Sequence, residues 1–100
     1  MKLEDKITLI SESFETDELE QERSVYSRKE IFAEFKSISQ SEFFKASQNG
    51  FRPELKITVW SVEYSGESLA FYNGVMYEIY RTYIDGDKTE LYLSKKVGAE

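Results

Sequence analysis

Hydrophobic and polar residues alternate along most of the chain, which is the pattern of strands that turn one face towards a core. In the second such run, Ile31, Ala33 and Phe35 alternate with mostly polar residues. Glycine-containing turns separate the later runs, and Asn73-Gly74 is the strongest two-residue signal for a hairpin. We expect strands at residues 6–11, 25–38, 54–62, 68–72, 75–84 and 89–95.

One stretch, residues 39–53 (SQSEFFKASQNGFRP), breaks this alternation and predicts a short helix. Ser39 is placed to accept a hydrogen bond from the backbone N–H of Glu42, whose carboxylate can reach back to the N–H of Ser39. This reciprocal capping box predicts that the helix begins at this point.

The end of the helix is also marked. Asn49-Gly50 supplies a residue for the left-handed conformation that closes a helix, and Phe51 is placed to fold back in a Schellman cap. Pro53 then forces Arg52 into an extended conformation. The segment therefore reads as a helix, a stop and an extended tip.

A helix of about ten residues is marginal in water, so we expect Phe43, Phe44, Ala46 and Phe51 to be docked on the sheet. The candidate dock is the strand at residues 75–84, because both of its faces are largely apolar. One face carries Val75, Tyr77, Ile79 and Tyr83, and the other carries Met76, Tyr80 and Ile84. The alternative is that this second face contacts another subunit.

These elements predict a mainly β fold. We expect a small antiparallel β-barrel of about six strands, with one short α-helix inserted between the second and third main strands. The chain of 100 residues makes a single domain, residues 1–100.

Charge changes this picture at one place. The formal net charge is −6, and residues 11–22 hold six acids and no basic residue, so acids and bases balance in the remainder. We interpret this segment as a solvated loop between the first two strands, with a contact for a basic partner as the alternative. Its spacing does not match a calcium-binding loop. The acidic balance argues against a sequence-independent grip on nucleic-acid phosphates.

The composition offers few side chains that could catalyse a reaction or bind a metal. The chain contains no cysteine and no histidine, so disulfides and thiolate metal sites are excluded, which is compatible with a reducing cytoplasm. No apolar run is long enough for a membrane span or a signal peptide. The serines lie in no nucleophile motif. The seven tyrosines and seven phenylalanines are interpreted as core and cross-strand pairs rather than a platform for bases. We expect no enzymatic activity, no catalytic residue, no cofactor and no metal.

Several of these runs together resemble the phage head-tail joining family, also called head-closure or head-tail adaptor proteins. The resemblance rests on SISQSEFFKASQNGFRPE, the ITVWSVEYSGE strand and turn, YNGVMYEIYRTY and ELYLSKK, and it covers the chain from Ile7 to Lys96. The segment TDELEQ at residues 16–21 resembles the loop of that family but has Glu20 where a glycine is common.

The resemblance implies a non-enzymatic virion protein of the neck of long-tailed phages and prophages. Such a β-barrel would be a monomer when free and a ring, usually twelvefold, in the virion. Its partners would be other copies, the portal or adaptor above, the tail-completion protein below, and packaged DNA in the channel without sequence specificity. The implied location is the head-tail interface, reached from the host cytoplasm during assembly, with no membrane involved.

In related proteins the segment corresponding to residues 39–53 projects towards the channel and can act as a stopper. We therefore expect this segment to rearrange on assembly, with Phe51 and Arg52 meeting a neighbouring subunit or the channel. Two alternatives remain, namely a tail-completion or minor tail protein, and a cellular SH3-like or OB-like binding module. The candidate assembly residues are Ser39, Glu42, Phe43, Phe44, Gln48, Asn49, Gly50, Phe51, Arg52 and Pro53.

Overall fold

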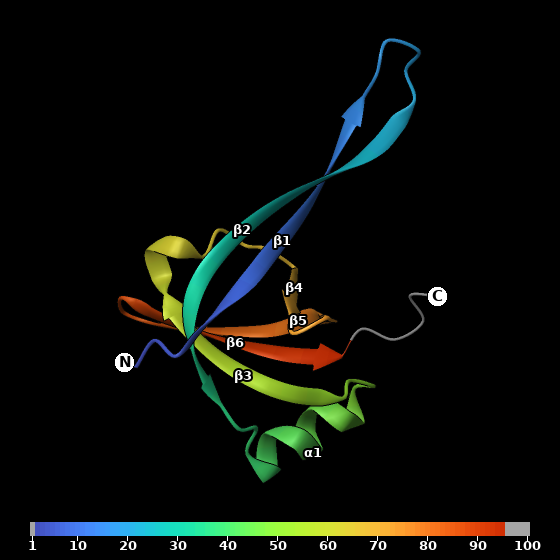
Figure 1. Ribbon diagram of the computed structural model, residues 1–100. Coiled ribbons are helices and arrows are strands. Elements are labelled where there is room, and N and C mark those ends of the chain that lie inside the picture. Colours follow the sequence, from blue (N-terminus) through green and yellow to red (C-terminus); the bar gives the residue numbers. More distant parts are fainter. Residues whose placement is uncertain (1, 96–100) are drawn as a thin grey trace.

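The computed structural model describes residues 2–95, which form six strands and one α-helix (Figure 1). The expected mainly β fold is confirmed, as is the position of the helix between the second and third strands. The elements are β1 (Asp5–Thr16), β2 (Glu22–Lys36), α1 (Gln40–Gln48), β3 (Pro53–Trp60), the 3₁₀ turn η1 (Ser61–Glu63), β4 (Leu69–Tyr72), β5 (Val75–Asp85) and β6 (Lys88–Lys95).

All neighbouring strands are antiparallel, and the sheet closes on itself in the order β1-β2-β3-β6-β5-β4. Two of the seams in this ring are short. β1 pairs with β4 only over Thr8, Leu9 and Ile10. β2 pairs with β3 only from Glu34 to Lys36. Closure therefore depends on a few residue pairs at one end of the long β1–β2 hairpin.

The core lies inside the closed sheet and comes from alternating strand positions. Leu9, Ala33, Ile57, Leu91 and Leu93 are completely shielded from solvent. They lie at alternating positions along their strands, as expected for side chains on the inner face of a sheet. The rest of the buried cluster consists of Ile7, Ile31, Val59, Ala70 and Tyr77. The apolar face predicted for the second run is confirmed at Ile31 and Ala33, which are both buried.

The turn at Asn73-Gly74 is a two-residue hairpin between β4 and β5. Both residues have positive φ, 52° for Asn73 and 79° for Gly74, as a type I′ turn requires. The expected hairpin is therefore confirmed, and its geometry explains the choice of these two residues.

The predicted long acidic loop is wrong, because most of the segment is strand. β1 continues five residues beyond the predicted end at Ser11, and β2 begins three residues before Val25. The connecting turn contains only residues 17–21. Both faces of this part of β1 are mostly polar, with Phe14 as the one large apolar residue, so the sequence does not show the alternation of a strand. The two strands form an arm, defined here as residues 11–28, that extends far beyond the closed sheet (Figure 1).

Asp17 organises the tip of this arm. Its Oδ1 accepts hydrogen bonds from the backbone N–H groups of Leu19 and Gln21, each at 2.9 Å. Glu20 adopts a φ of 59°, in the left-handed region that favours glycine. Glycine is common at the position of Glu20 in the resembled family, and a glycine there would relieve the backbone strain of this positive φ.

Candidate functional site

The helix α1 begins as its sequence predicts, but only half of the capping box forms. The Oγ of Ser39 accepts a hydrogen bond from the backbone N–H of Glu42 at 3.2 Å. The Glu42 carboxylate does not return to Ser39. It turns towards the sheet instead, because two donors on β5 bind it there.

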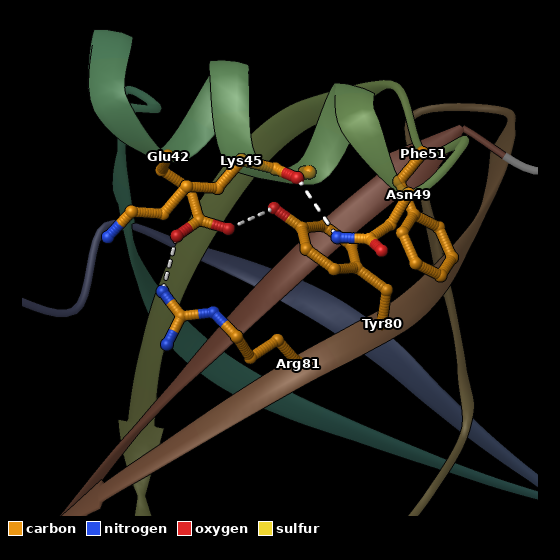
Figure 2. A pocket seen from close by; sticks show the side chains of 7 residues that line it. Glu42, Lys45, Asn49, Phe51, Tyr80 and Arg81 are labelled. Atoms are coloured by element: carbon orange, nitrogen blue, oxygen red, sulfur yellow. Dashed lines mark hydrogen bonds and ion pairs between the residues drawn. The ribbon is translucent and has the colours of Figure 1, made fainter.

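These donors are the hydroxyl of Tyr80, 2.8 Å from Oε2 of Glu42, and the guanidinium of Arg81, which pairs with Oε1 (Figure 2). Glu42 is 9% exposed, so its charge is held almost entirely by these two partners. The helix is thus tethered to the sheet by the buried carboxylate of Glu42. The sequence predicts docking by Phe43 and Phe44 instead.

A β-bulge in β5 explains how two consecutive residues reach the same carboxylate. Ile79 lies opposite Leu93 and Arg81 lies opposite Tyr92, so Tyr80 is an extra residue in this strand. In a bulge, two residues oppose one and the alternation of side chains is interrupted. Tyr80 and Arg81 can therefore both face the helix.

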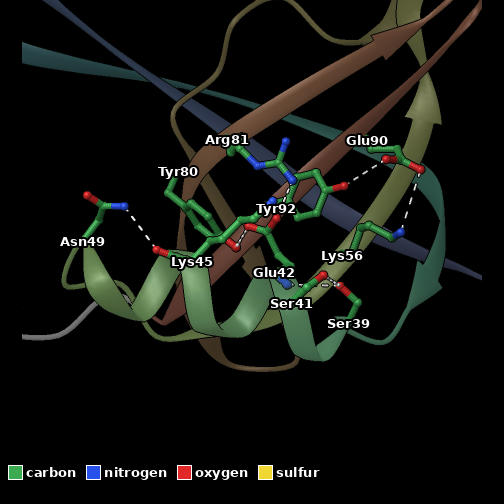
Figure 3. A network of polar contacts seen from close by, with 10 residues as sticks. All are labelled: Ser39, Ser41, Glu42, Lys45, Asn49, Lys56, Tyr80, Arg81, Glu90 and Tyr92. Atoms are coloured by element: carbon green, nitrogen blue, oxygen red, sulfur yellow. Dashed lines mark hydrogen bonds and ion pairs between the residues drawn. The ribbon is translucent and has the colours of Figure 1, made fainter.

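Tyr92 supports both of these side chains from β6. The Arg81 guanidinium lies 4.0 Å from the centre of the Tyr92 ring, and the Tyr80 and Tyr92 rings are 6.2 Å apart. The Tyr92 hydroxyl donates a hydrogen bond to Glu90, which pairs in turn with Lys56 (Figure 3). The tether is therefore part of a polar network that spans β3, β6, β5 and the helix.

The charges in this network follow from its contacts. Burial alone would raise the pKa of Glu42, but the hydrogen bonds from Arg81 and Tyr80 outweigh burial and hold that pKa below its ordinary value. Burial raises the pKa of the Tyr80 hydroxyl, and its hydrogen bond to Glu42 raises that pKa further. At neutral pH the carboxylate is therefore ionised and the phenol remains a donor.

The helix ends in the predicted Schellman cap. The N–H of Phe51 donates to the carbonyl of Ala46 at 3.0 Å, and the N–H of Gly50 donates to that of Ser47 at 3.1 Å. Gly50 has a φ of 85°. The Phe51 ring stacks on Tyr80, with centroids 4.9 Å apart and planes 19° from parallel. The bulged tyrosine thus holds both ends of α1.

A hollow of about 390 Å³ lies between α1 and β5. Its lining combines Glu42, Lys45, Ala46, Asn49, Phe51, Tyr80 and Arg81 (Figure 2). The carboxylate oxygens of Glu42 and the hydroxyl of Tyr80 already have hydrogen-bond partners within the protein. The hollow is best understood as the seam where the helix meets the sheet.

The expectation that Phe43 and Phe44 dock the helix is wrong. Phe43 is 48% exposed and Phe44 is 61% exposed, while Glu42 and Ala46 are the two buried residues of α1. The cause is the tether, because turning Glu42 towards β5 turns its two neighbours away. On the second face of β5, Met76 and Tyr80 are half-buried, whereas Ile84 is 69% exposed.

Phe43 borders a groove of about 610 Å³ beside the extended residues that follow the helix. The groove is lined by Phe43, Ser47, Gly50, Phe51, Arg52, Pro53 and Glu54. We call this surface, together with Phe44, the aromatic groove. It brings together most of the residues predicted for assembly.

The remaining predicted residues have varied surroundings. Gln48 and Asn49 are exposed, and Nδ2 of Asn49 donates to the carbonyl of Lys45. The backbone N–H of Arg52 donates to Oγ of Ser94 at 3.0 Å, while its side chain is exposed. Pro53 is buried at the start of β3. Arg52 and Pro53 are therefore bound to β6 and Phe51 to β5, so residues 50–53 do not project as a free tip.

Sequence reasoning missed the roles of Tyr80, Arg81 and Tyr92. Tyr80 was assigned to the correct face but as an apolar cover, because alternation carries no information about a bulge. In a regular strand the adjacent residues Tyr80 and Arg81 would point to opposite faces, so the sequence does not predict that both bind Glu42. The register between β5 and β6, which contains the bulge, is needed to predict it.

Comparison with models of known protein families finds no match for this chain, and comparison with curated proteins finds none either. Among residues 2–95, no helix is both long and apolar enough to cross a membrane. The same residues contain no group of three or more acidic side chains arranged to hold a metal ion.

Proposed function

We propose that this protein is a structural component of a phage neck, which assembles as a ring under the portal or adaptor and joins the DNA-filled head to the tail. One observation carries the proposal. Glu42 ties α1 to the closed sheet, while Phe43 and Phe44 of the same helix face solvent. Adjacent exposed aromatic residues on a tethered helix are typical of a surface that a partner covers.

The resemblance to the head-tail joining family supports the same role, because it includes the segment between β2 and β3 that bears this surface. In this proposal the closed sheet is a small β-barrel of the family's kind. The aromatic groove meets a neighbouring subunit in the ring, and the exposed side chain of Arg52 lies in that contact or at the channel.

The charge of the protein is compatible with a channel that DNA passes through. Sequence-independent DNA binding requires lysine and arginine to displace counterions, and this chain has a formal net charge of −6. DNA in the proposed ring is held by closure of the channel and not by adhesion to its wall. The protein acts by assembly and performs no chemical step.

The test uses the phage or prophage that encodes the chain. Inactivation of its gene should leave heads and tails unjoined, and the wild-type protein supplied from a plasmid should restore infectious particles. Supply of the double variant Phe43→Ser/Phe44→Ser should fail to restore them. The matched control is Val62→Ser, because Val62 is 90% exposed and lies on η1 away from the helix.

The proposal would be abandoned if the inactivated phage produced normal virions. Purification of the unjoined parts separates the proposal from its nearest alternative. The protein should be found with heads, whereas a tail-completion protein would be found with tails.

A further inference from the structure

The arm formed by β1 and β2 has two open edges. β1 meets β4 only over Thr8 to Ile10, and β2 meets β3 only over Glu34 to Lys36. Along the arm these strands pair only with each other. Among residues 2–95, no further strand pairs with the outer edge of either one in residues 11–16 and 22–33.

An open edge presents unpaired backbone N–H and C=O groups, which form a template for another strand. A ribbon of two strands is also marginal in water, so the arm lacks the packing that stabilises the closed sheet. Its outer face carries Phe14, 67% exposed, and Tyr26, 55% exposed. These two residues are diagonal neighbours, because Phe14 lies opposite Ser24 and Tyr26 lies opposite Glu12.

The two edges are complementary in charge. The outer half of β1 carries Glu12 and Glu15 and no basic residue. Within the arm, β2 carries Arg23 and Arg28 and one acid, Glu22, and neither arginine forms an ion pair within the described part of the chain. If two arms lie side by side with their tips level, Glu15 of one approaches Arg23 of the other, because the two residues are at the same height within each arm.

We propose that the arm is an assembly edge, in which the β1 edge of one copy pairs with the β2 edge of the next copy. Arms that point the same way bring these strands together antiparallel, since β1 runs towards the tip and β2 runs away from it. The contact joins two different surfaces, so it is heterologous and repeats from copy to copy. A dimer leaves two edges open, whereas a closed ring leaves none.

This inference deepens the proposed function and rests on it for the ring itself. It adds the surface that joins the copies, and the tip of this surface lies far from α1 (Figure 1). It also explains what keeps free copies apart before assembly. The tip of the arm carries three acidic residues, Asp17, Glu18 and Glu20, and these residues repel the same residues of another copy.

The tip acids oppose the same contact that the edges favour. Strands in a sheet lie about 4.8 Å apart, so neighbouring two-stranded arms place their tips roughly 10 Å apart. The Debye length is about 30 Å at 0.01 M salt and about 3 Å at 1 M salt. Repulsion between tips is therefore strong in dilute buffer and screened at high ionic strength. Salt also screens the attraction between Glu15 and Arg23, but the backbone hydrogen bonds that pair the two edges remain. The free protein stays monomeric until salt, or a basic surface that receives the tips, neutralises them.

The experiment measures self-association by analytical ultracentrifugation at 0.02 M and 1 M sodium chloride. The tip variant is Glu18→Gln/Glu20→Gln, which leaves Asp17 to hold the turn. The matched control is Glu4→Gln/Glu63→Gln, which removes the same charge outside both the arm and the aromatic groove. A third protein has residues 14–24 replaced by Asn-Gly, so that the arm ends in a two-residue turn after Ser13 and the closing seams are kept.

We expect the wild type to associate more strongly in 1 M salt and the tip variant to associate in 0.02 M salt, at concentrations at least tenfold lower than the wild type needs. Hydrogen exchange in residues 11–16 and 22–30 should slow at least tenfold on association. The control should behave as the wild type does, and the arm-shortened protein should remain monomeric.

The assembly edge is overturned if the tip variant stays monomeric, if the control associates equally well, or if association leaves exchange in the arm unchanged. It is also overturned if the arm-shortened protein forms the same rings. In that last case the proposed neck function is unaffected, because head-tail joining by the arm-shortened protein tests that function separately.

Discussion

The Glu42 carboxylate and the Tyr80 hydroxyl lie 2.8 Å apart, and this hydrogen bond joins the helix to the bulge in β5. Arg81 completes the pair of donors, and Phe51 stacks on the same tyrosine ring. The docking of α1 therefore depends on a polar contact, whereas the closed sheet is built around an apolar core. It is also reversible by a change of charge, because a protonated carboxyl would no longer accept from both donors with full strength.

Replacement of Glu42 by glutamine should destabilise the protein by about 1 to 2 kcal/mol, because it removes a charge-assisted hydrogen bond from a nearly buried site. The loss is limited because the Arg81 side chain is 46% exposed and can return to water. Urea unfolding followed by circular dichroism measures the change. Glu54→Gln, at an exposed position near the helix, should leave stability within about 0.5 kcal/mol of wild type. Equal effects of the two substitutions would contradict the assigned tether.

The docking of the helix should weaken in acid. The pKa of Glu42 is held below its ordinary value of 4.5, so its contribution is complete above that value and is lost as the pH falls through the lowered pKa. Amide chemical shifts of residues 40–52 should therefore change below about pH 4.5 while β6 keeps its native shifts. The pKa of Glu67 is also lowered, although burial opposes this, so Glu42→Gln serves as the reference. A transition of the same size in that variant would show that another group causes it.

The helix segment should open more readily than the sheet. The tether and the stacked ring are its main contacts, whereas β5 is hydrogen-bonded to β6 along nearly its whole length. Hydrogen exchange of the free protein should be faster by at least tenfold in residues 40–48 than in residues 77–83. Equal protection of the two segments would remove the basis for a helix that rearranges on assembly.

A glycine at the arm tip should stabilise the turn. Glu20 has a φ of 59°, which costs a non-glycine residue roughly 1 kcal/mol, and Glu20→Gly removes that strain. Slower hydrogen exchange at Leu19 and Gln21 measures the local gain. Glu18→Gly is the control, since the Glu18 backbone does not have positive φ. Faster exchange in Glu20→Gly would show that its side chain stabilises the tip.

The tip beyond the helix should matter for assembly more than for folding. Phe51→Ala/Arg52→Ala is expected to abolish head-tail joining and retention of packaged DNA. Loss of the Phe51 ring from Tyr80 should cost no more than about 3 kcal/mol, because Phe51 is only half-buried. Arg52→Ala alone separates the two effects, since the Arg52 side chain is exposed and its backbone hydrogen bond to Ser94 is kept. Intact joining in both variants would remove these residues from the interface.

Alternation and turn chemistry were sufficient to predict the strands of the closed sheet and both ends of the helix. Ile57 and Leu91 are buried because period-two patterning fixes which side of a strand they occupy. The orientation of the helix could not be predicted, because the usual rule that phenylalanine faces inward competes with a buried ion pair. Glu42 faces inward because the bulge at Tyr80 turns both Tyr80 and Arg81 towards the helix, and the sequence alone does not reveal that bulge.

The arm escaped prediction for a different reason. Glu12 and Glu15 lie on opposite faces of β1 where neither face is covered, so the core does not select apolar residues there. Polarity on both faces indicates a loop when sequence is read alone.

The single extra residue in β5 means that the fold and the docking of the helix are encoded separately. Deletion of Tyr80 alone would bring Ile79 and Arg81 into regular alternation opposite Leu93 and Tyr92. We expect such a protein to keep its closed sheet, while Glu42 and Phe51 lose the ring that both contact. Deletion of one residue therefore converts a protein with a docked helix into one with an undocked helix. Related chains can gain or lose a movable segment in this way without any change in their core.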